Sequence, residues 1–123
     1  ERNGDIKSKI TYNNGDKEKI LNATNLYFHN KSSNELQLLL RFKNLNNEWE
    51  TIGWFTFKPG EKAKVRSVLG PKFLYYAESL KNKKYWGGKE IRVYNGKSYK
   101  MKGIFISENT MSTLGNFTMS LSN

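Results

Sequence analysis

Apolar and polar residues alternate along most of this chain with a period of two. The clearest case is residues 36–43, where Leu36, Leu38, Leu40 and Phe42 occupy every second position. Because successive side chains of a strand point to opposite faces, this period predicts strands rather than helices. The segments that share the pattern are 26–29, 36–43, 50–57, 62–68, 72–79, 90–94, 97–105 and 116–121.

Short turn signals separate these segments. Pro59-Gly60 suits the centre of a type II turn, because proline fixes φ and glycine accepts a positive φ. Asn95-Gly96 lies between two alternating segments and is the strongest short-range signal for a type I′ hairpin. Gly70-Pro71 and Gly87-Gly88 predict further turns. Seven or eight strands at a spacing of about ten residues predict an all-β fold, a single antiparallel β-sandwich or flattened barrel.

Two of the predicted strands, 50–57 and 72–79, carry apolar bulk on both faces, since Trp54 and Tyr76 lie opposite the face that enters the core. Such an outer face is either covered by the protein's own chain or open to a partner. Large exposed apolar patches are uncommon on monomers, which favours cover by the N-terminal segment or by the loop of residues 80–88.

The 123 residues fit one domain. Apolar residues are sparse in 1–22, which we expect to be a loosely held tail or an extra hairpin, followed by one β-sandwich domain over 23–123. No apolar run approaches the 18 or so residues of a transmembrane segment. The chain begins at Glu1 rather than Met, which we interpret as removal of a leader or tag and which favours a secreted or envelope protein, although a cytoplasmic one stays open.

The net charge of +10 suggests a polyanionic partner, either nucleic acid or acidic glycan. Lysine outnumbers arginine 17 to 4, and 15 residues are asparagine, a composition that A/T-rich coding also produces. Arginine is the residue that specific phosphate readers favour, so nucleic acid is the less favoured partner.

Residues that support catalysis are few. The chain has no cysteine, and His29 is its only histidine, so thiolate chemistry is excluded and a histidine-dependent triad would need His29. Glu48 and Glu50 stand two positions apart and could form a carboxylate pair, and Glu78 is a further candidate. Without a nucleophile-base pair or a metal-binding cluster, we predict no enzyme, no catalytic or metal residues and no cofactor.

The segment LKNKKYWGGKE, residues 80–90, combines lysines with two aromatic residues and a Gly-Gly pair. Basic groups beside flat rings suit stacking on a sugar or base, or docking on an acidic protein. The favoured interpretation is instead a long loop whose Trp86 folds back over Trp54 and Tyr76. The candidate binding residues are Trp54, Tyr76, Lys83, Lys84, Tyr85, Trp86, Lys89 and Arg92.

The order GWFTFKPGE, FLYYAES and YWGG resembles the GWW, PGE, YYYAE and W-x-G order of small bacterial all-β domains, the domain of unknown function family 1036. The resemblance covers about residues 25–99 and implies a bacterial origin and an all-β fold, with no known activity. Cysteines that those domains often carry are replaced here by Lys62 and Val93.

These observations predict a non-catalytic binding or accessory module of the bacterial envelope or secreted space, with a protein or an anionic glycan as partner. Two alternatives remain. One is a polyanion binder that uses the loop from Lys81 to Lys89 with Arg92 nearby. The other is a small carboxylate-dependent hydrolase that uses Glu48, Glu50 or Glu78.

Overall fold

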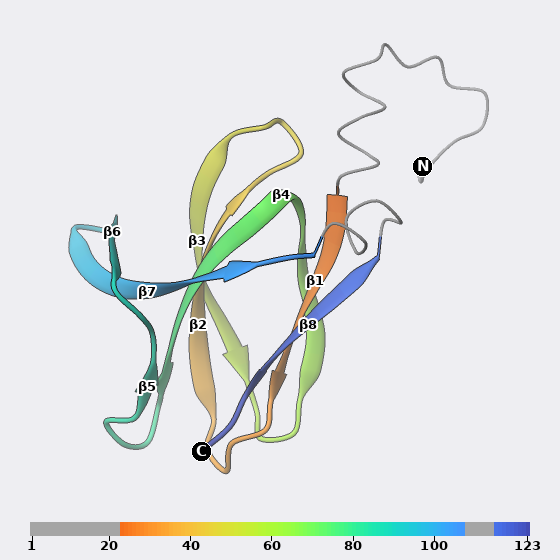
Figure 1. Cartoon of the computed structure of the whole chain (residues 1–123). Coiled ribbons are helices and arrows are strands. Elements are labelled where there is room, and N and C mark those ends of the chain that lie inside the picture. Colours follow the sequence, from red (N-terminus) through yellow and green to blue (C-terminus); the bar gives the residue numbers. More distant parts are fainter. Residues whose placement is uncertain (1–22, 108–114) are drawn as a thin grey trace.

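The computed structural model describes residues 23–107 and 115–123, which form eight strands and no helix (Figure 1). The predicted all-β class is therefore confirmed, while the prediction for residues 1–22 lies outside the described residues. The strands are β1 (Ala23–Asn30), β2 (Leu36–Lys43), β3 (Trp49–Phe57), β4 (Lys62–Ser79), β5 (Tyr85–Trp86), β6 (Glu90–Tyr94), β7 (Lys97–Phe105) and β8 (Asn116–Leu121).

The main sheet has the strand order β3-β2-β4-β1-β8. Hairpins place β2 and β3 side by side, and β4 pairs antiparallel with both β1 and β2. The last strand, β8, lies parallel to β1, with Asn25 opposite Asn116. The strand pairings are antiparallel as predicted except at this edge, because β8 joins β1 across a large distance in sequence and no short turn dictates its direction.

The predicted turn at Gly70-Pro71 is also wrong, because residues 62–79 form one long bent strand, β4. Its first half pairs with β1 and its second half with β2, so the strand passes from one layer of the fold to the other (Figure 1). Gly70 has a φ of 78°, which changes the direction of the strand without reversing it. Pro71 still accepts a hydrogen bond from the Ile106 amide at 2.6 Å. A Gly-Pro pair at a sheet corner thus bends the chain as a bulge would.

The bend at Gly70 gives a prediction. A Cβ at this position would have no atom within 4 Å, so substitution has no steric cost beyond that of the backbone. We expect Gly70→Ala to lower the free energy of unfolding by about 1–2 kcal/mol, because an L-residue resists positive φ. Asparagine tolerates that region better, and Gly70→Asn should cost less than Gly70→Ala. Urea unfolding of both variants measures the difference, and equal stability of Gly70→Ala and the parent would contradict the bend.

The main core lies between the two layers that β4 connects. At its centre Phe28 of β1 contacts the rings of Phe73 and Tyr75 of β4, with centroids 6.1 and 5.5 Å apart. Edge-to-face contacts of this kind stabilise aromatic cores. The buried members are Leu26, Phe28, Leu36, Leu38, Leu40, Phe42, Phe57, Val65, Val68, Phe73, Tyr75, Ala77, Ile106 and Leu121.

Asn30 is a polar side chain inside this fold, with only 1% of its surface exposed. Its Nδ2 donates to the carbonyl oxygens of Asn34 at 2.9 Å and Phe57 at 3.2 Å. Its Oδ1 accepts from the amide and the hydroxyl of Ser32 at 2.9 and 2.6 Å. The Asn30 carbonyl also accepts from the Gly60 amide at 2.7 Å. One residue therefore joins the β1–β2 turn to the β3–β4 turn.

Both tight turns form as predicted. Gly60 has a φ of 84°, and the Lys58 carbonyl accepts the Glu61 amide at 3.0 Å. The Glu61 carboxylate in turn accepts the Lys58 amide at 2.9 Å, which anchors the turn. At the second turn Asn95 and Gly96 have φ values of 49° and 79°, as a type I′ hairpin between β6 and β7 requires.

Candidate functional site

The β6–β7 hairpin covers the outer face of the layer formed by β3, β2 and the second half of β4. Leu39 of β2 and Leu74 of β4 are buried beneath it, together with Met101 of β7 itself. We call Trp54, Tyr76, Tyr94 and Tyr99, which pack around them, the outer aromatic cluster. Trp54 has edge contacts with Tyr76, Tyr94 and Tyr99 at 6.3, 6.4 and 5.5 Å. The Tyr94 hydroxyl also donates to the Gly53 carbonyl at 3.0 Å.

The outer face is thus covered by the protein's own chain, as expected, but the prediction that Trp86 covers it is wrong. Trp86 pairs with Ala77 on β4, and the Ala77 side chain is in the main core. Opposed residues of paired strands share a face, so Trp86 packs against the main core. Its Nε1 donates to the Ser122 carbonyl at 2.8 Å.

Tyr85, the neighbour of Trp86 on β5, lies on the opposite face of the sheet. Tyr85 pairs with Glu78, and its ring stacks on Tyr76 at 5.9 Å with an interplanar angle of 26°. The side chains of adjacent residues in a strand point to opposite faces of the sheet. The structure therefore brings the candidates Trp54, Tyr76 and Tyr85 together and separates Trp86 from them.

The loop lysines do not converge on a site. Lys81, Lys83, Lys84 and Lys89 are all exposed, and the Lys84 ammonium lies 5.5 Å from the centroid of the Trp86 ring. The Gly-Gly pair approaches β7 rather than leaving room for a ligand. The Gly88 amide donates to the Lys100 carbonyl at 3.0 Å, and a Cβ on Gly87 would collide with the same carbonyl oxygen.

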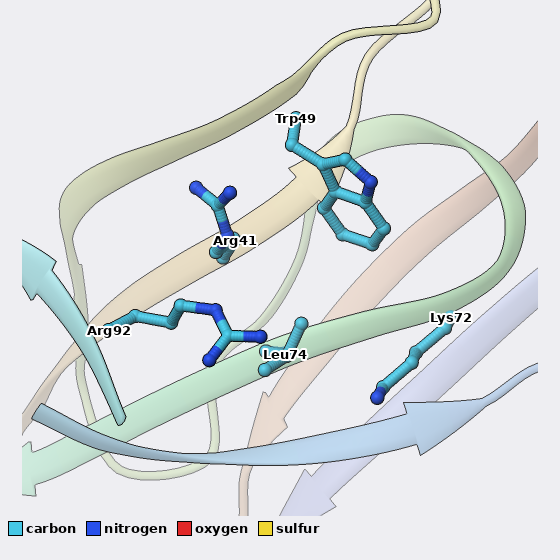
Figure 2. A pocket seen from close by; sticks show the side chains of 5 residues that line it. All are labelled: Arg41, Trp49, Lys72, Leu74 and Arg92. Carbon is cyan, nitrogen blue, oxygen red and sulfur yellow. The ribbon is translucent and has the colours of Figure 1, made fainter. Parts of the chain in front are cut away.

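A pocket of about 320 Å³ opens on the covered face, and we call it the cationic pocket (Figure 2). Its walls come from four strands of the fold: the lining residues are Arg41 of β2, Trp49 of β3, Lys72 and Leu74 of β4, and Arg92 of β6. Arg41 pairs with Leu74 across β2 and β4. In Figure 2 the side chains of Arg92 and Lys72 extend toward Leu74 from opposite sides.

Two of the three cations in this pocket share one carboxylate. Glu90 is 3.0 Å from the Lys72 ammonium and 3.5 Å from the Arg92 guanidinium. Arg41 forms no ion pair within the described part of the chain; its guanidinium donates to the Thr51 hydroxyl at 3.0 Å. The pocket therefore holds an excess of positive charge.

The indole of Trp49 forms a flat wall beside these charges. The Arg41 guanidinium and the Lys43 ammonium lie 5.6 and 5.9 Å from its ring centroid, within the range of cation–π attraction. Trp49 remains 41% exposed. A ligand in the pocket can therefore meet both an aromatic surface and arginine donors.

A second pocket, of about 280 Å³, lies between β5 and β7, and we call it the tyrosine pocket. Tyrosines from three strands line it together with the start of β7. Its lining residues are Tyr76, Tyr85, Lys97, Ser98, Tyr99 and Lys100.

Tyr76 is held as a protonated donor in the wall of the tyrosine pocket. Its hydroxyl donates to the Glu78 carboxylate at 2.9 Å, and the other Glu78 oxygen accepts from Gln37 at 2.6 Å. Burial raises the pKa of Tyr76 well above its usual range, and the hydrogen bond to Glu78 and the charge of Glu78 add to this rise.

Two of the candidate carboxylates of the hydrolase alternative, Glu50 and Glu78, are far apart. Glu50 pairs with Phe42 and Glu78 with Gln37 on β2. Five residues of strand separate those partners by about 17 Å, whereas glycosidase carboxylates stand about 5–9.5 Å apart. Glu50 accepts the Asn44 amide at 2.9 Å, a turn-anchoring contact. Residues 23–107 and 115–123 hold no group of three side chains that could bind a metal.

The chain matches no protein-family model, and no curated protein matches it. The resemblance to family 1036 therefore stays a prediction. Within the described ranges no helix has the length and apolar character of a membrane span.

Three of the pocket residues, Arg92, Tyr76 and Tyr85, were predicted from the sequence, and the others were not. Arg41 and Lys43 recur with a period of two on the outer face of β2, which was a usable signal for an outward-facing basic row. Trp49 lies opposite Lys43 across the short β2–β3 hairpin. Lys72 and the β7 residues join the pockets only through the pairing of distant strands, which the local pattern does not specify.

Proposed function

We propose that the protein is a non-catalytic binding module that takes an acidic glycan in the cationic pocket. The observation that carries this proposal is the convergence of Arg41, Lys72 and Arg92 on one hollow. Glu90 is the one carboxylate that pairs with them in the described part of the chain. Three cations against one carboxylate favour an anionic ligand, because the uncompensated charge is concentrated in a recess.

The dimensions and walls of the pocket support a sugar ring. A volume of about 320 Å³ is at the lower end of the range of small-molecule sites, about 300–1,000 Å³. Trp49, which is 41% exposed, supplies apolar surface on which the C–H face of a pyranose can pack, and the buried Leu74 closes the floor of the pocket. Guanidinium groups bind carboxylates and sulfates through two parallel hydrogen bonds. A uronic acid or a sulfated sugar combines these two features.

The non-catalytic role, the compartment and the contribution of the loop lysines are further parts of the proposal. The separation of Glu50 from Glu78 supports a non-catalytic role, since the two cannot act on one glycosidic bond. The proposed compartment is the bacterial envelope or secreted space, where acidic polysaccharides are accessible to a protein. The exposed lysines of the loop from Lys81 to Lys89 provide long-range attraction for the same ligand.

Calorimetry with a heparin-derived disaccharide tests the proposal. We expect Arg41→Gln combined with Arg92→Gln to weaken binding at the cationic pocket at least about tenfold, since charged hydrogen bonds contribute more than neutral ones. The matched control is Lys83→Ala combined with Lys84→Ala, which removes the same number of positive charges from the loop. Because exposed charges are screened by salt, this control should change the affinity by less than about threefold.

A third variant, Glu90→Gln, is expected to raise the affinity for the disaccharide. Glu90→Gln removes the carboxylate that competes for Lys72 and Arg92, so it should strengthen binding. Equal losses in the arginine and lysine pairs would contradict a built site and favour diffuse polyanion binding. Tighter binding of single-stranded DNA than of the disaccharide, with a salt slope that the lysine pair lowers, would favour the nucleic-acid alternative.

A further inference from the structure

The tyrosine pocket shares no lining residue with the cationic pocket. Its position is set by β5, which follows a lysine-rich loop and pairs back with β4, and by Gly88, whose amide donates to the Lys100 carbonyl of β7. Tyr85 comes from β5, Tyr76 from β4 and Tyr99 from β7. The pocket is thus a separate recess with its own supporting strands.

The tyrosine rings form a fixed floor for this recess. Tyr85 stacks on Tyr76 at 5.9 Å, and Tyr76 contacts Tyr99 at 5.1 Å. The Tyr76 hydroxyl is held by Glu78, and Trp54 packs against Tyr76 from the outer aromatic cluster. Tyr85 nevertheless remains 58% exposed. Since one side of its ring is stacked on Tyr76, exposure at this level leaves aromatic surface for a ligand.

The rim of the recess is positively charged. Lys97 and Lys100 line it and are both exposed, and the Lys97 ammonium lies 5.3 Å from the centroid of the Tyr99 ring. The lining residues include no carboxylate. A complementary ligand therefore has a flat apolar face for the tyrosines and an anionic group for the lysines, with hydroxyl groups that Ser98 can meet.

We infer that the tyrosine pocket is a second ligand site, which takes a sugar ring carrying a carboxylate or sulfate group. The inference rests on the proposed function for its ligand class but not for its location. A volume of about 280 Å³ suits a single ring. Single-stranded nucleic acid is a poorer fit, because its binding proteins present successive aromatic platforms along a groove.

The number of disaccharide molecules bound per chain tests this inference by calorimetry. The parent should bind two heparin-derived disaccharides, and Tyr85→Ala should bind one, because it removes the exposed ring without opening the main core. Tyr85→Phe should keep both sites, since stacking needs the ring and not the hydroxyl. The matched control is Tyr27→Ala, because Tyr27 also lies beneath a lysine, with the Lys62 ammonium 5.6 Å from its ring centroid, but lines neither pocket.

The arginine pair of the cationic pocket separates the two proposals. Arg41→Gln with Arg92→Gln should leave one site, and adding Tyr85→Ala should abolish it. One site in the parent that the arginine pair removes and Tyr85→Ala leaves intact would overturn this inference and keep the proposed function. One site in the parent that only Tyr85→Ala removes would overturn the proposed function and keep this inference. Tyr85-dependent binding of an oligothymidylate, without binding of the disaccharide, would overturn the ligand class.

Discussion

Replacing Asn30 with alanine is expected to lower the free energy of unfolding by about 4 kcal/mol. The substitution removes four side-chain hydrogen bonds, two that Asn30 donates and two that it accepts. Each such bond contributes about 0.5–1.5 kcal/mol net, and a buried partner left unpaired costs more. The site is 1% exposed, so water does not readily replace the lost groups.

Urea unfolding measures this loss, with Asn46→Ala as the control because Asn46 is an exposed asparagine in the β2–β3 turn. The control should stay within about 0.5 kcal/mol of the parent. Asn30→Asp should also be destabilising, because the carboxylate keeps the two acceptor bonds from Ser32 but cannot donate to Asn34 or Phe57. A loss below 1 kcal/mol for Asn30→Ala would show that the two turns hold their positions without this side chain.

Trp54→Ala is expected to lower the free energy of unfolding by about 3 kcal/mol, the low end of the range for truncating a buried aromatic residue. Trp54 is half-buried and contacts three tyrosines of the outer aromatic cluster. Its removal should loosen the β6–β7 hairpin as well as the sheet beneath it.

Double variants identify what covers Trp54. The losses of Trp54→Ala and Tyr99→Ala should be non-additive by about 0.5–1.5 kcal/mol, because the two rings are in contact. Trp54→Ala and Trp86→Ala should instead add to within about 0.5 kcal/mol, because the two indoles pack on opposite faces of the sheet. Coupling to Trp86 and independence from Tyr99 would reverse the assignment of the covering element.

Much of the strand pattern was predictable because it is local. The segments 36–43, 90–94, 97–105 and 116–121 match strands of the structure in their bounds. Alternation fixes which residues share a face, and the Asn95-Gly96 turn fixes the pairing of two of these segments. The same reasoning correctly predicted that Trp54 is covered.

What could not be predicted depends on pairing across long sequence distances. A Gly-Pro pair can reverse a chain or bend it, and the choice at Gly70 depends on the pairing of β4 with β1 and β2. The assignment of Trp86 required its register against Ala77. The cationic pocket likewise exists only because Arg41 of β2 is opposite Leu74 of β4, beneath a hairpin formed later in the chain.

The bent strand β4 has a consequence for how ligands are found. It supplies buried residues to the main core and also the floor of both pockets through Leu74 and Tyr76. Neither layer can melt while the other stays intact, because both are built on this one strand. A compound that binds only the folded chain at either pocket therefore raises the melting temperature of the whole fold. Thermal-shift screening of a glycan collection can thus detect ligands without any assay of activity.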